Sequence, residues 1–426
     1  MARLRISADR LLDGTGAAPL EGGVAVLVED DRIVAAGLEA AVPAPEDARR
    51  RAFPGSTILP GLIDQHVHLC VARGRTKVED TRGRTDEELL VWGVGSAERM
   101  LRAGVTTVFD CGARGRSGLR IRDAVAAGLG LGPRILASGR PITITGGHCW
   151  FWGEESDGEA AVRASVARLL DEDGADGIKI MATGGYSTPT TDPRLSAYPV
   201  EVLAAAAEEA HKRGRYITAH AHGVDGMRAA SEAGIDCLQH ASMIGEGRGW
   251  TFDETLAREL AARGTRAAVT MMQSVRIQRE SGVVVDWRAA RRGDPLGVAM
   301  WMADARGLLD AGVTLVTGTD MTTGTDPDHG EELILEIEGH VEIGMSPLAA
   351  LRAATAEGAR NLRIEGITGS LRPGLAADLL VVDGAPDRDI HALRRPVLVV
   401  RQGMPIVPTR LADPTLRLPL VEALPA

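Results

Sequence analysis

The sequence predicts an α/β fold, namely a (β/α)₈ barrel with a small β-sandwich domain formed from both chain termini. Three observations lead to this prediction: eight apolar strand-like runs, helical stretches between them, and two ends of the chain that carry strands without helices. The eight runs cover residues 61–69, 105–112, 134–142, 177–185, 216–223, 237–241, 265–271 and 314–320. Strands that alternate with helices favour a parallel sheet, and eight such units are typical of a closed barrel.

Helix candidates rich in Ala, Leu, Glu and Arg separate these strands, and several end in glycine, which commonly terminates helices. They cover residues 85–104, 156–175, 199–215 and 295–312. Toward the two ends of the chain, short strands are joined by turn residues alone. These terminal strands cover residues 22–37, 375–389 and 395–407. We therefore expect residues 60–364 to form the barrel, and residues 1–59 and 365–426 to form the composite β-sandwich domain.

The composition is that of a large globular protein built on aliphatic packing. The chain has 426 residues, 44% of them hydrophobic and only 3% aromatic, which suffices for one large barrel and a satellite domain. The formal charge of −10 is spread without long runs, which argues against a nucleic-acid partner or an anionic membrane surface. Neither a signal-peptide core nor an apolar stretch of roughly 18 residues is present, so we expect a cytoplasmic protein.

Two of the ten histidines stand two residues apart in the stretch PGLIDQHVHL (60–69). On a β-strand alternate side chains share a face, so His66 and His68 point in the same direction. Two imidazoles in this arrangement can bind a metal ion, but they can equally belong to the solvated polar face of a strand. The two histidines alone leave both interpretations open.

Further polar residues fall within or at the ends of other predicted strands. Lys179 lies in the fourth strand, His220 and His222 end the fifth, His240 ends the sixth and Asp320 ends the eighth. In a barrel the carboxyl ends of the strands meet at one mouth, where active sites of this fold lie. Any single member could be structural, as a helix cap, a core histidine or a snorkelling lysine. A structural role does not account for five strands at once, so the sequence predicts a functional site at the mouth.

Lys179 is the unusual member of this set, because its neighbours Ile178 and Ile180 must face the helices and it must therefore face inward. A protonated lysine there would suffer both desolvation and repulsion from metal ions held by the histidines. A neutral amine can instead react with carbon dioxide to form a carbamate. The two oxygens of that carbamate can bridge two divalent cations.

In the order and spacing of these motifs the chain resembles the amidohydrolase superfamily, in its two-metal branch with a bridging carboxylated lysine. The resemblance extends from the N-terminal strands through PGLIDQHVHL, GIKIMATGG, TAHAHG, LQHA and TGTD to GSLRPGLAADLLVVDG (369–384). It covers nearly the whole chain. Within the superfamily, the chain is most similar to the prolidase-like group, which includes Xaa-amino-acid carboxypeptidases.

The resemblance implies two divalent metal ions and assigns their ligands. The implied ligands are His66 and His68 for the first ion, His220 and His240 for the second, Lys179 as N6-carboxylysine between them, and Asp320 on the first ion. Imidazole, carboxylate and carbamate donors suit Zn²⁺ best, although manganese, cobalt and iron also fit.

The resemblance also implies a hydrolytic mechanism. A metal-bridged hydroxide would attack a carbonyl group, and Asp320 would take its proton and return it to the leaving nitrogen. The stretch ITITGGHCWFWG (142–153) follows the third strand and contains a Thr-Gly-Gly-His motif. In the prolidase-like group the histidine of a similar motif helps to hold the substrate carbonyl, and His148 occupies that position.

Four further residues are candidates for substrate binding or for the rim of the barrel. His222 lies on the same strand face as His220, so it either contacts the substrate or replaces His220 as a ligand, and we favour the first role. Arg140 and Tyr186, on the loops after the third and fourth strands, are candidate substrate clamps or ordinary loop residues. His329 is the remaining histidine that falls near the mouth.

We therefore expect a metal-dependent hydrolase that cleaves an amide C–N bond in a dipeptide, an N-acyl amino acid or a related small amide or carbamate. One alternative is a deaminase or cyclic-amide hydrolase acting on a heterocycle, but one-metal members of the superfamily usually lack the bridging lysine. A second alternative is a non-catalytic scaffold, but such homologues typically lose ligands, and this chain retains all six. We expect a small-molecule amide as the partner, with no nucleic acid or membrane, and assembly into a homo-oligomer.

Overall fold

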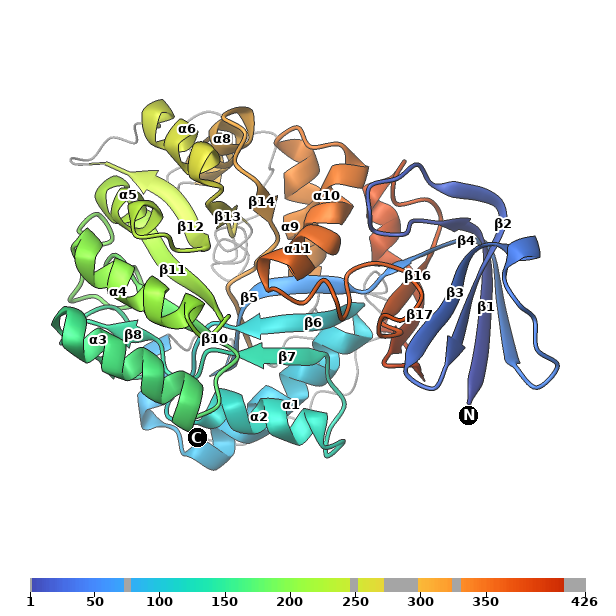
Figure 1. The fold of residues 1–426 in the computed structure, drawn as a ribbon, viewed down its shortest axis with the longest axis horizontal. Helices are drawn as coiled ribbons and strands as arrows, with labels where there is room; N and C mark the ends of the chain where they lie inside the picture. The colour runs from blue at the N-terminus through green and yellow to red at the C-terminus, as the bar shows by residue number, and fades with distance from the viewer. Residues whose placement is uncertain (1, 73–77, 246–251, 272–297, 324–330, 410–426) are drawn as a thin grey trace, which may run out of the picture.

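The computed structural model describes residues 2–72, 78–245, 252–271, 298–323 and 331–409. Figure 1 shows a set of strands surrounded by helices, with a second, separate sheet standing at one end of it. Among the described helices, none is long and apolar enough to cross a membrane.

Eight strands of the described chain form the barrel, and they follow one another around it in chain order. They are β5 (Leu62–Ala72), β6 (Val105–Asp110), β7 (Arg134–Ala137), β10 (Gly177–Met181), β11 (Tyr216–Gly223), β12 (Cys237–Ile244), β13 (Arg266–Ala268) and β14 (Leu315–Val316). Parallel ladders join β5 to β7 in one run and β10 to β14 in another. The short strands β8 (Ile142–Thr143) and β9 (Glu154–Glu155) extend the second run beyond β10.

Backbone hydrogen bonds link the two runs into a ring. Between β7 and β10, the amide of Asp176 donates to the carbonyl of Ala137 at 2.9 Å. On the other side, the amide of Gln65 in β5 donates to the carbonyl of Thr317 just after β14 at 3.1 Å. Strand β15 (Met321–Thr323) then pairs in parallel with the end of β5. The predicted α/β barrel is thus confirmed, although β6, β7, β10, β13 and β14 are shorter than the sequence indicated.

Most of the helices cover the outside of this ring (Figure 1). The α-helices are α1 (Asp86–Arg102), α2 (Ser117–Ala126), α3 (Gly158–Ala167), α4 (Val200–His211), α5 (Val224–Glu232), α6 (Glu254–Arg263), α8 (Val298–Asp310), α9 (Glu331–Glu342), α10 (Pro347–Ala353) and α11 (Ala356–Asn361). The shorter helices are η1 (Glu39–Ala41), η2 (Val78–Gly83), η3 (Arg168–Glu172) and η4 (Ile390–Arg394). Local sequence sets their ends: Thr85 and Glu88 form a capping box at the start of α1, and Gly264 ends α6 in the left-handed conformation.

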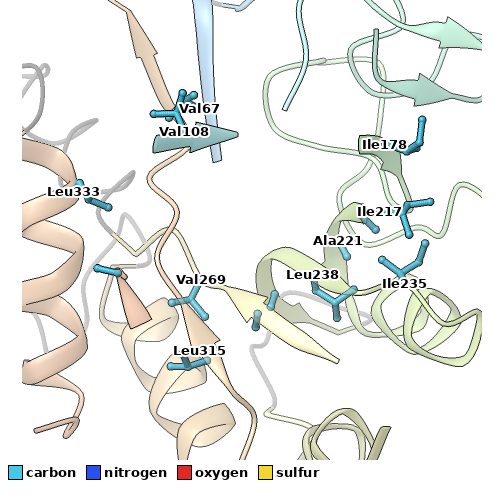
Figure 2. Close-up of a cluster of buried hydrophobic side chains, with 14 of the residues drawn as sticks. Val67, Val108, Ile178, Ile217, Ala221, Ile235, Leu238, Val269, Leu315 and Leu333 are labelled. Carbon is cyan, nitrogen blue, oxygen red and sulfur yellow. The ribbon is translucent and has the colours of Figure 1, made fainter. Parts of the chain in front are cut away.

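Two apolar layers hold the strands in place. Figure 2 shows part of the outer layer, in which Ile178 and Ile217 lie in one buried cluster with residues of the surrounding helices. A second cluster fills the barrel at the opposite end from the mouth, where the rings of Phe109 and Tyr216 meet edge to face at 5.2 Å. Because side chains alternate along β10, the outward direction of Ile178 leaves Lys179 pointing into the barrel, as expected.

Strands from both termini combine into one sheet. In spatial order they are β18 (Met404–Ile406), β17 (Pro396–Arg401), β16 (Leu379–Asp383), β4 (Arg49–Pro60), β1 (Arg3–Leu11), β2 (Leu20–Glu29) and β3 (Arg32–Leu38). Strand β4 pairs in parallel with β1 and antiparallel with β16, and it runs through Gly61 directly into β5. A sheet drawn from both ends of the chain agrees with the sequence analysis, whereas the domain boundaries and the two-layer sandwich stay predictions.

Candidate metal centre and active site

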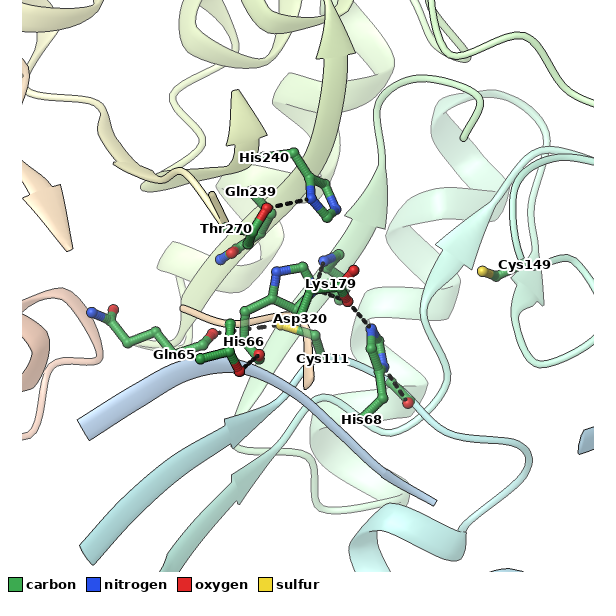
Figure 3. Close-up of polar contacts among 12 residues, drawn as sticks. Gln65, His66, His68, Cys111, Cys149, Lys179, Gln239, His240, Thr270 and Asp320 are labelled. Carbon is green, nitrogen blue, oxygen red and sulfur yellow. Dashed lines mark hydrogen bonds and ion pairs between the residues drawn. The ribbon is translucent and has the colours of Figure 1, made fainter. Parts of the chain in front are cut away.

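The polar residues predicted at the strand ends converge on the mouth of the barrel (Figure 3). His66 and His68 come from β5, Lys179 from β10, His240 from β12, and Asp320 from the turn before β15. Each of these side chains belongs to a residue that is at most 9% exposed. These five side chains come from four separate parts of the chain and lie together at the mouth, as the sequence predicted.

The first ligand group consists of His66, His68 and Asp320, whose ligand atoms lie within 4.8 Å of one another. Oδ1 of Asp320 is 3.2 Å from Nε2 of His66 and 3.2 Å from Nε2 of His68. The amide of Asp320 donates to the carbonyl of His66 at 2.7 Å, which ties the turn to β5. Two imidazoles and a carboxylate facing one point form a donor set that suits a divalent transition metal.

The second group consists of His220, His222 and His240, whose ligand atoms also lie within 4.8 Å of one another. The rings of His222 and His240 are stacked with centroids 4.5 Å apart, and the ring of His220 is 4.7 Å from that of His240. This group adjoins the first, because the ring centroids of His66 and His240 are 5.1 Å apart. His222 is thus close enough to act as a ligand, which is the alternative that the sequence left open.

Lys179 lies next to both ligand groups. Its Nζ lies 3.2 Å from Nε2 of His66 in the first group. In the strand register, Lys179 stands opposite Thr218 and Met181 stands opposite His220, so β10 and the second group are adjacent. The inward orientation predicted for this lysine is therefore observed.

Backbone carbonyl groups orient two of the histidines. Nδ1 of His68 lies 2.9 Å from the carbonyl oxygen of Gly112, and Nε2 of His220 lies 3.0 Å from that of Gly184. A carbonyl oxygen only accepts, so each of these ring nitrogens carries the proton. The other nitrogen of each ring, Nε2 of His68 and Nδ1 of His220, is left with a lone pair that can bind a metal ion.

Hydroxyl groups orient the other two histidines of the second group. Nδ1 of His222 is 2.6 Å from Oγ of Ser242, and Nδ1 of His240 is 2.9 Å from Oγ1 of Thr270. In both rings Nε2 remains for a ligand. Partners of this kind on the outer nitrogen are characteristic of metal-binding histidines.

Burial keeps these imidazoles neutral. It lowers the pKa of His66, His220 and His240 well below the usual value, and the pKa of His222 to about 3. A protonated Lys179 would lower the pKa of each ring further. A neutral imidazole is the form that binds metal ions, so the residues present fit such a cofactor.

Asp64 makes hydrogen bonds that hold the first ligand group in position. Its Oδ1 accepts from the amides of His66 and Thr319, both at 3.1 Å, and its Oδ2 accepts from the hydroxyl of Thr319 at 2.7 Å. Burial raises the pKa of this carboxyl to about 7. Asp64 thereby joins the strand that carries His66 to the segment that carries Asp320.

Backbone strain is concentrated at this end of the barrel. Asp320 and His240 have φ angles of 53° and 72°, in the left-handed region that residues with a Cβ rarely adopt. Further non-glycine residues with positive φ in this part of the chain are Cys149, Ala241, Met243 and Thr270. Strained residues of this kind persist where the surrounding structure holds them, and they cluster at active sites.

His148 borders the second group, as expected from its motif. Its ring centroid is 4.4 Å from that of His220, and burial lowers its pKa to about 3. Tyr186 also reaches the mouth: it is 58% exposed, and its ring meets that of His222 edge to face at 5.1 Å. Both side chains therefore border the second group, and their roles as substrate contacts stay predictions.

Arg140 is engaged elsewhere. Its Nε donates to Glu154 at 2.7 Å and one of its terminal nitrogens donates to Asp173 at 2.9 Å. Two carboxylates on one guanidinium leave little of it for a substrate, so this geometry disfavours the clamp role, which stays an untested prediction. His329 lies outside the described residues.

Several residues near the site were not expected from the sequence. Trp152 lies with its ring 5.3 Å from that of His68 and donates from Nε1 to Thr81 at 2.6 Å. Trp301 on α8 lies parallel to His222, with centroids 6.3 Å apart. The aromatic run WFWG was a visible signal for the first tryptophan, whereas nothing in the sequence around Trp301 marked it.

Comparisons with known proteins identify the family of this chain. Residues 57–406 match the model of the amidohydrolase family. Ochratoxinase from Aspergillus niger is 28% identical over 440 residues, covering 92% of this chain and 84% of its own. Imidazolonepropionase from Salinispora arenicola is 28% identical over 415 residues, covering 91% of this chain and 93% of its own.

A solved structure points to the same family. The crystal structure of a Xaa-Pro dipeptidase with methionine bound in its active site has 26% sequence identity and a TM-score of 0.80, and the match covers 95% of this chain and 100% of that one. The fold, the two ligand groups and the match over residues 57–406 agree. The chain therefore belongs to the amidohydrolase family, whose members depend on metal ions, and it is a hydrolase that acts on carbon–nitrogen bonds.

Proposed function

We propose that this chain hydrolyses an amide bond in a dipeptide, an N-acyl amino acid or a related small amide or carbamate, at a centre of two divalent metal ions. The observation that carries the proposal is the presence of two adjoining ligand groups, which are His66, His68 and Asp320 on one side and His220, His222 and His240 on the other. Two metal ions in neighbouring sites assist hydrolysis in several classes of enzyme, among them aminopeptidases, which cleave amide bonds.

The first group is proposed to hold one ion and His220 and His240 to hold the second, with His222 as an alternative ligand. Zn²⁺ is the ion that these donors suit best, because neutral imidazole and carboxylate ligands in a buried site are typical of zinc enzymes. The hydrogen-bond partners of His68, His220 and His240 support this assignment, since they leave the second nitrogen of each ring available for a metal ion.

We also propose that Lys179 is carboxylated and bridges the two ions. An ammonium group 3.2 Å from Nε2 of His66 would occupy the lone pair that the metal needs. It would also place a poorly solvated positive charge beside two cations, since Lys179 is 1% exposed. A carbamate replaces that charge by an anion with two oxygen donors.

In the proposed mechanism, Asp320 and His148 have different roles. Bound divalent ions supply a lowered pKa of water and polarisation of a carbonyl oxygen. Asp320, which is 9% exposed and stands at the edge of the first group, accepts the proton of the attacking water and delivers it to the leaving nitrogen. His148 donates a hydrogen bond to the carbonyl oxygen as negative charge develops there.

The residues around the mouth favour a substrate with an apolar or aromatic group. Tyr186 and Trp301 lie against His222 and offer a ring edge and a ring face next to the proposed metal ions, and Trp152 packs behind His68. Two of the proteins that this chain resembles, ochratoxinase and a Xaa-Pro dipeptidase, suggest which substrates to test first. We therefore place N-acyl aromatic amino acids and Xaa-Pro dipeptides first among the candidates.

The test is a substrate panel with the zinc-loaded protein. N-acetyl and N-benzoyl derivatives of L-phenylalanine and L-proline, together with Ala-Pro and Met-Pro, are incubated and the released amine is measured by mass spectrometry. At least one amide should be cleaved, and Asp320→Asn should lower turnover by roughly a thousandfold or more, because the proton carrier is lost. Metal content is measured in both proteins, so that loss of an ion is distinguished from loss of the proton carrier. A wild-type protein with two zinc ions that cleaves no member of the panel, or an Asn variant with unchanged turnover, would contradict the proposal.

A second candidate activity is hydrolysis of a cyclic amide, and the similarity to imidazolonepropionase favours its inclusion. Imidazolone propionate is therefore added to the panel. Faster cleavage of this ring than of any linear amide would reassign the substrate class. The homo-oligomeric state and the cytoplasmic location stay predictions.

A further inference from the structure

The loop that follows β10 makes a contact with His148 that the assigned roles leave unexplained. Oγ1 of Thr188 lies 3.1 Å from Nδ1 of His148, and both residues are buried, at 1% and 6% exposed. The same hydroxyl oxygen accepts a hydrogen bond from the amide of Cys149 at 3.0 Å. Thr188 is therefore held next to His148 by the residue that follows His148 in the chain.

Hydrogen-bond valence decides the direction of the contact between Thr188 and His148. A hydroxyl group has one proton to donate, and a buried hydroxyl proton without an acceptor is costly. In the described part of the chain, Nδ1 of His148 is the acceptor within reach of that proton, because the other contact of Oγ1 is with an N–H donor. Nδ1 must then be unprotonated, and the ring proton must be on Nε2.

We propose that Thr188 is a positioning residue that holds His148 in the tautomer with its proton on Nε2, so that this nitrogen can donate to the carbonyl oxygen of the substrate. This inference rests on the function proposed above, in which His148 contacts that oxygen. It adds the residue that determines whether His148 is a donor there at all, because the opposite tautomer would present a lone pair to the carbonyl oxygen.

The Nε2 end of the ring is available for this purpose. The contact that the described residues make with Nε2 is Sγ of Cys149 at 3.5 Å, and a thiol sulfur is a weak acceptor. A carbonyl oxygen is a stronger acceptor and would replace it. The ring centroid of His148 also lies 4.4 Å from that of His220, so the ring borders the predicted metal centre.

The rest of the loop fixes the ring in place. A Cβ on Gly185 would lie 2.5 Å from Nε2 of His148, so only glycine allows the loop to pass this close to the imidazole. Oγ1 of Thr191 accepts from the amide of Gly185 at 3.1 Å and donates to the carbonyl of Thr188 at 2.9 Å. Gly185 and Thr188 are thereby held in one turn, with His148 between that turn and the ring of His220.

The direct test reads the tautomer and does not require a substrate. In the zinc-loaded protein labelled with ¹⁵N-histidine, long-range ¹H–¹⁵N correlation spectra distinguish protonated from unprotonated ring nitrogens, and the His148 signals are assigned by their loss in His148→Gln. We expect a single Nε2–H tautomer for His148 in the wild-type protein and in Thr188→Ser, and a mixture of tautomers in Thr188→Val. A wild-type His148 with its proton on Nδ1 would overturn the proposal, whether or not any variant folds.

Kinetics on the best-cleaved amide of the panel then test the consequence. Thr188→Val should lower kcat by about tenfold to a hundredfold with KM little changed, whereas Thr188→Ser, which keeps the hydroxyl, should retain most of the activity. In a His148→Ala background the same Val substitution should have almost no further effect, because its partner is already absent. An equal loss in both backgrounds would show a purely structural role and overturn the proposal. If the panel shows no hydrolysis, the proposed function fails while the tautomer measurement still decides the role of Thr188.

Discussion

At the scale of single residues, the chemical state proposed for Lys179 can be tested by substitution. It is buried beside His66, with Nζ 3.2 Å from Nε2. We predict that Lys179→Ala lowers metal content and reduces turnover by at least roughly a hundredfold, because the proposed bridging ligand is lost. A short carboxylic acid such as acetate or propionate, added to the solution, should restore part of both by supplying the missing oxygens.

The matched variant is Lys179→Arg, which fills the same space but cannot form a carbamate. It should be inactive and should not respond to the added acid. Metal analysis and turnover on one amide, with and without acetate, make the comparison. Wild-type activity in Lys179→Ala without any added acid would show that the lysine is not a ligand.

At the scale of elements, the strands were more predictable than the contacts made where they end. Each predicted barrel strand is present, because an apolar run between a turn and a helix leaves few alternatives. Strand β14 nevertheless contains only Leu315 and Val316, and Asp320 lies in a left-handed turn beyond it. A turn of that kind depends on the tertiary hydrogen bonds of Asp64 with Thr319, which local sequence does not contain.

The partners of the imidazoles could not be predicted for the same reason. Ser242 and Thr270 reach His222 and His240 from strand ends 20 and 30 residues away in the chain. The histidines of the candidate metal centre are visible in sequence because they fall within or at the ends of several predicted strands, β5, β11 and β12. A serine or threonine at a strand end is too common to stand out, and the carboxylates that engage Arg140 are equally ordinary.

The segment between β14 and β15 provides an element-scale prediction. A Cβ on Gly318 would lie 2.9 Å from Cβ of His66 and 3.1 Å from Cβ of Ala268, so this segment packs directly on the strand that carries the first ligand group. Gly318→Ala should push His66 out of position and destabilise the protein by about 1–3 kcal/mol. It should also weaken metal binding by roughly tenfold to a hundredfold.

A glycine in open space supplies the control for this substitution. A Cβ on Gly366 would meet no atom of the described residues within 4 Å, and Gly366 does not have a positive φ, so Gly366→Ala should change neither property. Chelator titration measures metal affinity and thermal unfolding measures stability in both variants. Equal zinc affinity in the two would mean that the first ligand group tolerates displacement of His66.

At the scale of the whole molecule, one end of the barrel packs against the terminal sheet and the other end carries the ligand groups. The terminal sheet meets the barrel at the amino ends of the strands, where Asp378 accepts from Arg134 of β7 at 3.1 Å and from the amide of Gln402 at 2.8 Å. The carbonyl of Asp378 accepts from the amide of Gly61, between β4 and β5, at 3.1 Å. The ligand groups lie at the opposite end, so substitutions in the terminal sheet should affect stability before they affect chemistry.

The stability of the whole chain should also depend on pH through a buried acid outside the site. Asp304 on α8 is 5% exposed, its Oδ2 has no hydrogen-bond partner among the described residues, and burial raises its pKa to about 8. Since the folded state prefers the neutral carboxyl, its contribution to stability is fully present below the unfolded-state pKa near 4 and is lost as pH rises toward 8. Asp304→Asn, which cannot ionise, should therefore gain stability relative to wild type as pH rises, by several kcal/mol between pH 5 and pH 8. Denaturant unfolding at these two pH values measures the difference.

Asp310→Asn on the same helix is the control, because Asp310 is exposed and its substitution should change the free energy of unfolding by less than about 1 kcal/mol at either pH. A difference between Asp304→Asn and wild type that stays constant with pH would show that Asp304 is ionised in the folded protein and has a partner for its charge.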